Sequence, residues 1–175
     1  MGYFAVAPWP KFLKVISSLG TGLMLLVGVA AYRAVPVPSG FTHWFGVGVA
    51  MVPLAALVGS ALFMVRGYTI RDADLSIERL GFFTSVSLSG LSRAWHDPAV
   101  CKGSRRVFGN GGLFAFCGVF YRKDLGRYRL FATDLSRAVV LVLPGRVAVV
   151  TPADPEGFIA YLQRRFPSVA VGPAD

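Results

Sequence analysis

Two long apolar runs dominate the first third of the chain. Residues 15–32 contain no charged side chain over 18 positions, and residues 44–65 contain none over 22 positions. A helix needs roughly 20 mostly apolar residues to cross the hydrocarbon core of a bilayer. The pattern therefore predicts a membrane anchor over residues 1–66, in which transmembrane helices at about 12–32 and 44–65 are joined by the Pro- and Gly-containing loop 34–40.

A different pattern begins at residue 67. Short segments of alternating or continuous apolar residues are separated by turn residues, which is typical of β-strands. Asp72 and Asp74 suit a turn between the first two segments, and Pro144 with Gly145 marks a later hairpin. The seven predicted strands cover residues 68–70, 75–77, 85–89, 113–121, 127–132, 138–143 and 146–150.

The last predicted element has a helical period. Asp154 is a suitable N-cap, Pro155 is tolerated at the first helical position, and apolar residues recur at helical spacing up to Phe166. The predicted fold class is therefore a membrane α-hairpin followed by an α+β domain over residues 67–168, with a C-terminal tail at 169–175. We expect this domain to be a seven-stranded antiparallel β-barrel or sandwich capped by the C-terminal α-helix.

The charged residues are unevenly distributed. No acidic residue occurs in the first 65 positions, although the chain holds nine, and the net charge is +9. Lys11, Lys14 and Arg66 flank the two runs at their outer ends, whereas the connecting segment holds only Arg33 and His43. Because basic residues favour the cytoplasmic side of a membrane, this asymmetry predicts that both termini and the domain are cytoplasmic.

The first run has an alternative interpretation as a cleaved signal peptide. Lys11 and Lys14 precede it, and two alanines precede Tyr32, as in a cleavage site. The run is long for that role and a second run follows almost at once, so the uncleaved hairpin is favoured.

Small residues recur inside both runs, where they allow helix backbones to approach closely. They serve either packing of the hairpin on itself or docking against a larger membrane protein, and the sequence leaves both open. The apolar segment Tyr3–Trp9 also suits a surface that lies against another protein or the membrane interface. The candidate packing residues are Gly20, Gly28, Gly46, Ala50, Ala55 and Gly59.

Four short motifs resemble small bacterial pleckstrin-homology-like (PH-like) proteins that carry a membrane hairpin. They are residues 67–70 (GYTI), 75–77 (LSI), 93–95 (RAW) and 147–158 (VAVVTPADPEGF), and the resemblance spans about residues 66–166. It implies a seven-stranded PH-like barrel capped by a helix, used for binding rather than chemistry, in the bacterial inner membrane. The first hairpin turn departs from lipid-reading members of the wider fold, because Asp72 and Asp74 repel phosphate.

The densest basic groups of the domain are candidate lipid- or partner-binding residues. Arg127 and Arg129 have the same parity within one predicted strand, so both side chains point to one face. Such residues bind lipid headgroups or an acidic partner surface, and the alternative is a solvated outer face. The candidates are Arg105, Arg106, Arg122, Lys123, Arg127 and Arg129.

No motif indicates chemistry. Cys101 and Cys117 lack metal-ligand spacing, and His96 next to Asp97 has no nucleophile motif beside it. The Gly-rich segment 109–112 is followed by a predicted strand and lacks the lysine of a phosphate loop, so we expect a turn that leads into that strand. The sequence predicts no enzyme, no metal, no cofactor and no small-molecule substrate.

The expected function follows from these absences. Neither apolar run holds an internal ionisable residue, which disfavours a transport path. We expect a non-enzymatic accessory subunit whose hairpin and PH-like domain dock onto a larger integral-membrane complex. The alternative is an autonomous membrane-tethered module that binds anionic lipid headgroups or a peptide, and nucleic acid is not an expected partner.

Overall fold

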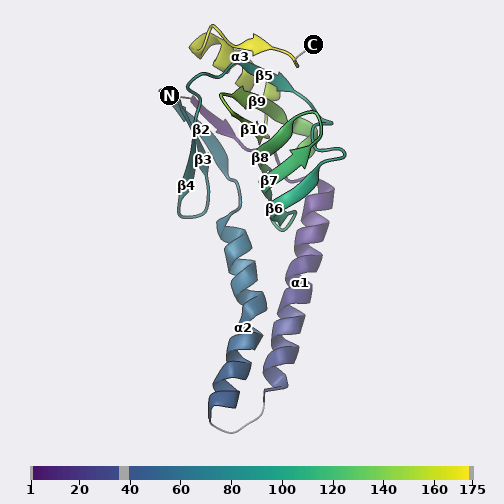
Figure 1. Cartoon of the computed structure of the whole chain (residues 1–175). Helices are drawn as coiled ribbons and strands as arrows, with labels where there is room; N and C mark the ends of the chain where they lie inside the picture. The colour runs from purple at the N-terminus through teal and green to yellow at the C-terminus, as the bar shows by residue number, and fades with distance from the viewer. Residues whose placement is uncertain (1, 36–39, 174–175) are drawn as a thin grey trace.

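The computed structural model describes residues 2–35 and 40–173, and two long helices extend from one end of a β-rich domain (Figure 1). Helix α1 covers Lys11–Arg33 and α2 covers Phe41–Leu62. Both are long and apolar enough to span a membrane, and most of their large apolar side chains are exposed, unlike those of a soluble core helix. The expected loop 34–40 lies largely outside the described residues, which stop at Val35 and resume at Gly40.

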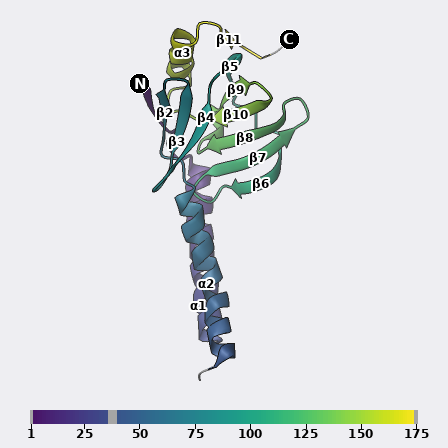
Figure 2. The same ribbon diagram turned by 60° about the vertical axis from the view of Figure 1, so that its left-hand side comes forward.

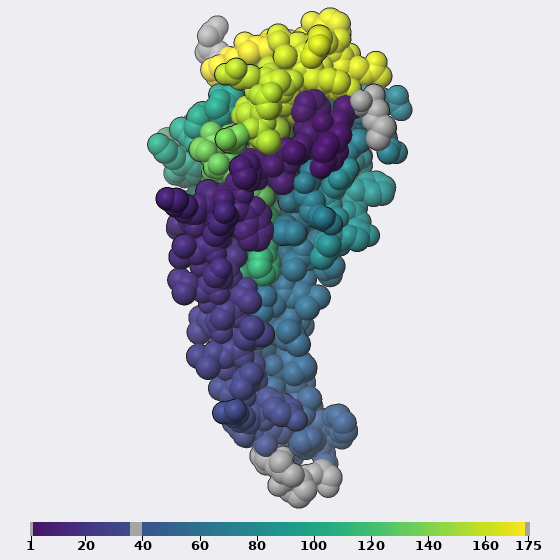
Figure 3. Space-filling model, turned by 180° about the vertical axis from the view of Figure 1, so that it is seen from behind, coloured from purple at the N-terminus to yellow at the C-terminus, as the bar shows by residue number. Residues whose placement is uncertain are grey.

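The helical hairpin is inserted between two paired strands. Strand β1 (Gly2–Ala5) precedes α1, β2 (Gly67–Arg71) follows α2, and the two strands pair in antiparallel register. The segment Tyr3–Trp9, expected to face another molecule, therefore begins as part of the domain. Figure 3 shows these N-terminal residues lying across the domain surface beside the C-terminal helix.

The strands form two sheets instead of the single seven-stranded antiparallel barrel that the sequence predicted. A four-stranded sheet has the order β1-β2-β3-β4, with β3 at Asp74–Glu78 and β4 at Phe83–Ser87. A seven-stranded sheet has the order β11-β5-β9-β10-β8-β7-β6. Its strands are β5 (Arg93–His96), β6 (Arg105–Gly111), β7 (Phe116–Arg122), β8 (Gly126–Ala132), β9 (Val139–Leu143), β10 (Arg146–Val150) and β11 (Ala170–Val171).

Two pairings in the larger sheet are parallel, β10 with β8 and β11 with β5. The tight hairpin at Pro144 and Gly145 turns β9 into β10, and β10 lies between β9 and β8. A short 3₁₀ turn (Leu135–Arg137) lies between β8 and β9, and the backbone from β8 to β10 runs through this turn and β9. The expectation of a wholly antiparallel sheet was therefore wrong.

All seven predicted strands exist, but β1, β5, β6 and β11 were missed. The segment 109–112 was expected to be a turn, whereas Gly109 and Gly111 lie within β6. Gly109 has φ of 113°, and a Cβ there would lie 2.2 Å from the Cys117 carbonyl oxygen of β7. This close backbone approach requires glycine in a strand, which a turn-like composition conceals.

The core has two parts, one on each face of the larger sheet. The first lies between the two sheets and is closed by helix α3 (Pro155–Arg165), whose Phe158 and Leu162 are fully buried. The second lies on the opposite face around Tyr128 and Leu130. The Asp154 carboxylate accepts a hydrogen bond from the Gly157 N–H at 3.0 Å, which confirms the predicted N-cap.

Candidate functional site

The domain contacts helix α1 through the tip of the β6–β7 hairpin. The Ser17 hydroxyl of α1 accepts a hydrogen bond from the Phe114 N–H at 3.0 Å, at the tip of the β6–β7 hairpin. Asn110 shapes that tip, because its Oδ1 accepts from the Gly112 and Leu113 N–H groups at 3.2 and 3.0 Å. In Figures 1 and 2, β6 lies on the side of the domain next to the helices, in keeping with the contact between the hairpin tip and α1.

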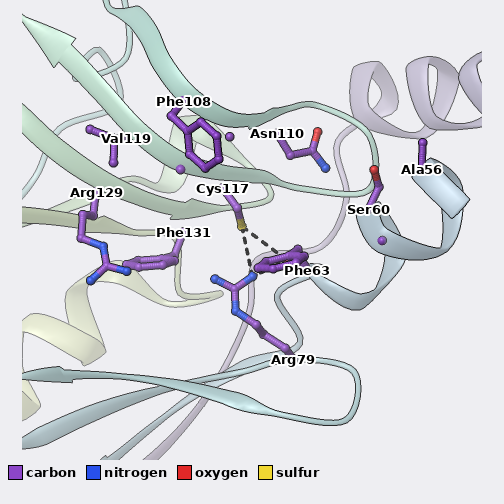
Figure 4. Close-up of a pocket in the computed structure, with 13 residues that line it drawn as sticks. Ala56, Ser60, Phe63, Arg79, Phe108, Asn110, Cys117, Val119, Arg129 and Phe131 are labelled. Carbon is purple, nitrogen blue, oxygen red and sulfur yellow. Dashed lines mark hydrogen bonds between the residues drawn. The ribbon is translucent and has the colours of Figure 1, made fainter.

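A cleft of about 530 Å³ lies between the last two turns of α2 and the larger sheet (Figure 4). The helix contributes small side chains to one wall, and the strands contribute the opposite wall. Its lining residues are Ala56, Gly59, Ser60, Phe63, Arg79, Phe108, Gly109, Asn110, Cys117, Gly118, Val119, Arg129 and Phe131.

Arg79 forms one end of this cleft and is only 8% exposed. Its Nη1 donates to the Phe63 carbonyl at 2.6 Å, at the C-terminus of α2, and its Nε donates to the Thr84 hydroxyl at 3.0 Å. A cation at this position is favoured by the negative end of the helix dipole. Arg79 therefore helps to fix where α2 ends.

A second arginine shares an aromatic partner with Arg79. The guanidinium carbons of Arg79 and Arg129 lie 5.6 and 5.3 Å from the centroid of the same Phe131 ring. Among the described residues, no carboxylate lies within ion-pair distance of either guanidinium. The cleft consequently concentrates positive charge beside apolar surface, which is the environment that an anion with an apolar part requires.

Three candidate basic residues share one face of the larger sheet. Arg105 and Arg127 lie directly opposite Tyr121 on its two sides, and Arg129 lies opposite Val119. Arg127 and Arg129 are exposed while Tyr128 and Leu130 between and beside them are buried, as their parity requires. Arg105 of this row lies on the edge strand β6, and Arg129 lines the cleft.

The remaining three candidates lie elsewhere. Arg106 pairs opposite Phe120 and therefore faces the other side of the sheet. Arg122 is held by the domain itself, through ion pairs with Asp97 at 3.7 Å and Asp124 at 2.6 Å. Lys123 is exposed in the β7–β8 turn. The six candidates do not form one patch.

The candidate small residues also separate into groups. A Cβ on Gly28 would lie 3.4 Å from the Ala50 carbonyl oxygen, and Gly46 faces Val35, so these residues pack the hairpin on itself. Gly20 instead faces Leu113 of the domain. Within the described residues, a Cβ added at Gly59 would meet nothing within 4 Å, and neighbouring Ala55 on the same helical face is exposed.

The possible reactive side chains are engaged structurally. Burial raises the pKa of Cys117 and of Cys101, so both thiols stay protonated and weakly nucleophilic near neutral pH. His96 Nε2 lies 3.0 Å from the Ser136 carbonyl, and Asp97 accepts from the Ala99 N–H. No group of three potential metal ligands occurs among the residues that the structure describes.

The outer face of the first hairpin is acidic, as its turn residues suggested. Asp72, Asp74 and Glu78 line a shallow hollow on the four-stranded sheet. Arg71 also lines it, and Asp72 lies 3.9 Å from Arg165. Three carboxylates make this surface unsuited to phosphate.

Sequence reasoning missed Arg79 as a site residue. Its position depends on the turn in which the Arg79 N–H donates to the Phe82 carbonyl, between β3 and β4. This turn directs the guanidinium toward Phe63 and Phe131, residues distant in sequence. The only available signal was an arginine among the aromatic residues Phe82 and Phe83.

Comparison with known families agrees with this architecture. The family model described as bacterial PH domain matches residues 66–166, which is more than half of the chain. No curated protein and no solved structure gives a significant match. The resemblance inferred from the four short motifs is thus confirmed, and the chain belongs to the bacterial PH domain family, with two apolar helices that fit a membrane hairpin inserted ahead of the matched region.

Proposed function

We propose that this protein is a non-enzymatic accessory subunit that docks onto a larger integral-membrane complex through its hairpin and its PH-like domain. The observation that carries the proposal is the insertion of the hairpin between the paired strands β1 and β2. Because the helices continue directly into a sheet at both ends, a partner that fixes the helices in the membrane also orients the domain. A flexible tether would not transmit orientation in this way.

The surface left on α2 supports docking within the membrane. Gly46 and Ala50 serve the hairpin. Ala55 and Gly59, at the same four-residue spacing, have no helix against them in the described part of the chain, and Gly59 also lines the cleft. Small residues at this spacing favour close packing of a further helix.

The proposed topology places the domain on the cytoplasmic face of the bacterial inner membrane. The exposed residues Lys11, Lys14 and Arg66 lie at the domain end of the hairpin, and Arg33 lies at the other end. Retention of the first helix is supported by the segment that precedes it, since Ala7 is fully buried and its carbonyl accepts from the Thr133 hydroxyl at 2.6 Å. Cleavage within α1 would remove these contacts.

Affinity purification from membranes in mild detergent tests the docking. We expect stoichiometric partners with the wild-type chain and several-fold lower recovery with Ala55→Leu, which blocks close helix approach. Val49→Leu is the matched control, because Val49 is exposed on a different face of α2. A monomer free of partners in native membranes would contradict the proposal.

Cysteine labelling in intact cells tests the topology separately. Ser39→Cys, in the expected outer loop and outside the described residues, should react with an impermeant maleimide. Lys123→Cys, exposed in the β7–β8 turn, should react only after the cells are opened. The reverse pattern would place the domain on the outer face.

The row of Arg105, Arg127 and Arg129 supports a second candidate, an autonomous module that binds anionic headgroups. Exposed arginines near the membrane surface each contribute roughly 1 kcal/mol of attraction to anionic lipid. Co-sedimentation of the purified protein with anionic liposomes, but not with neutral ones, would favour this candidate over docking.

A further inference from the structure

We propose that the cleft between α2 and strands β6–β8 binds one anionic phospholipid of the surrounding bilayer, with its phosphate in the part of the cleft that Arg79 and Arg129 line and its acyl end along Ala56 and Gly59. The inference rests on the membrane anchoring of the hairpin. It does not rest on docking to a partner complex.

The first argument is the height of the cleft relative to the bilayer. At 1.5 Å per residue, Ala56 lies about 22 Å and Ser60 about 28 Å along α2 from its first residue, Phe41. The hydrocarbon core is about 30 Å thick. When Phe41 lies at one boundary of that core, the cleft lies at the other boundary, where phospholipid phosphates and the first acyl carbons are found.

The second argument is uncompensated charge. Arg79 is 8% exposed and bonds only neutral groups in the described structure, namely the Phe63 carbonyl, the Thr84 hydroxyl and the Cys117 sulfur. Burial of a cation without an anionic partner is costly, and Nη2 of Arg79 makes no hydrogen bond within the described residues, which leaves it as a donor for a charge-assisted hydrogen bond to phosphate. Arg129 lines the same cleft and is exposed, with its guanidinium carbon 5.3 Å from the Phe131 centroid, so it adds a second positive charge to the site.

The third argument is the nature of the walls. Phe63, Phe108 and Val119 present apolar surface, and Phe108 is 77% exposed, so a large aromatic ring at this level stands uncovered. Gly59 leaves open space on the opposite wall. The volume of about 530 Å³ lies within the range of sites that enclose small ligands.

These features together favour a lipid over a soluble anion. A soluble phosphate would need only the arginine end, and would leave the apolar wall formed by a spanning helix without an occupant. An amphiphile uses both ends, and the membrane delivers it directly to the opening beside α2.

The test uses the full chain alone in nanodiscs of phosphatidylcholine. Each preparation contains the same small fraction of a probe with a photoactivatable acyl chain, either phosphatidylglycerol or phosphatidylcholine. After irradiation, mass spectrometry of peptides should find phosphatidylglycerol on the end of α2 and on β6–β7 at least about threefold more often than phosphatidylcholine, as expected for charge-assisted binding.

Two variants and one control locate the binding. Arg129→Gln should abolish the preference for phosphatidylglycerol, and Gly59→Leu should lower labelling by both probes because it fills the cleft. Arg127→Gln is the matched control, since Arg127 lies on the same strand and face but does not line the cleft. Arg79 is left intact, because its bond to Phe63 supports the end of α2.

Four results would overturn the proposal: equal labelling by the two probes, a preference that survives Arg129→Gln, labelling that Gly59→Leu does not lower, or loss of labelling when inorganic phosphate is added. The last result would assign the site to a soluble anion. Because no partner protein is present, failure here leaves the docking proposal intact, and success does not depend on it.

Discussion

The two halves of one face of the seven-stranded sheet differ in burial, because one half is covered by other elements and the other is largely exposed. On β9 and β10, residues such as Leu141 and Val150 are fully buried beneath the four-stranded sheet and α3. On β6, β7 and β8, the same face carries Phe108 and Arg129, which are exposed. The smaller sheet leaves part of this second half uncovered in the described structure, and the end of α2 lies opposite that part across the cleft.

The difference shows how this domain separates stability from binding. The covered half is buried and apolar, so truncation of a side chain there removes packing contacts. The open half joins Arg129, the exposed Phe108 and the small residues of α2 that line the cleft, none of which belongs to the buried core of the domain. Substitutions in the covered half should therefore lower the stability of the fold. Substitutions in the open half should instead weaken the binding of a lipid or a membrane partner.

Phe158→Ala should give the largest effect, because it opens a cavity in the covered half. Phe158 is fully buried, and its ring packs edge-on against Phe4 of β1 at 4.9 Å between centroids. Loss of such a ring costs about 3–5 kcal/mol of unfolding free energy. Urea denaturation in detergent, followed by tryptophan fluorescence, measures it. A loss below about 1 kcal/mol would show that the two sheets do not share a tight core.

Tyr68→Phe should have the next largest effect. The buried Tyr68 hydroxyl donates to the Phe131 carbonyl at 2.6 Å and accepts from the Thr151 N–H at 3.0 Å. Its removal leaves two buried polar groups unsatisfied, which costs about 1–3 kcal/mol. The same denaturation experiment at neutral pH measures the loss.

Tyr68 also predicts a dependence on alkaline pH. Burial raises the pKa of this phenol far above its ordinary value, so the folded state favours the protonated form. The stability that this provides is complete below about pH 10 and is lost as the pH rises above it. Stability of the wild type should therefore fall more steeply than that of Tyr68→Phe in this range, and parallel curves would contradict the assignment.

Most of the strands were predictable from the sequence, and the cleft was not. Alternating and continuous apolar segments identified seven strands, namely β2, β3, β4, β7, β8, β9 and β10, because burial imposes a regular pattern. β1 was not predicted because it lies ahead of a spanning helix, and β6 was not predicted because its glycines resemble a turn. The cleft depends on Arg79, Phe63 and Phe131, which only the fold brings together.

The choice among the six basic candidates also required the fold. Judged by charge alone, Arg106 and Arg122 are as good candidates for a binding site as Arg127 and Arg129. The β-bulge between Arg106 and Phe108 changes which residues of β6 share a face, and the ion pairs of Arg122 are made with Asp97 and Asp124. Neither feature has a local signal in the sequence.

Ser17→Ala tests the fastening of the open half to α1, with a smaller effect. The Phe114 N–H would lose its acceptor, at a cost of about 1 kcal/mol for one hydrogen bond. The effect should be local, so amide hydrogen exchange at residues 110–116 should quicken several-fold while the exchange of β9 and β10 stays unchanged. Equal changes in both regions would show that the hairpin tip and the core unfold together.

Arg129→Gln should have the smallest effect on folding, and its sign should depend on the lipid. In neutral phosphatidylcholine nanodiscs the substitution loses one cation–π contact of about 0.5–1 kcal/mol but relieves repulsion from Arg79 across the Phe131 ring, so the unfolding temperature should hardly change. In phosphatidylglycerol nanodiscs the wild type gains stability from any lipid that binds only the folded state, and the variant does not. The wild-type unfolding temperature should therefore rise with phosphatidylglycerol content while that of Arg129→Gln stays flat. Arg127→Gln, on the same face but outside the cleft, should follow the wild type, because general attraction to the membrane surface acts on both arginines and the cleft acts on one.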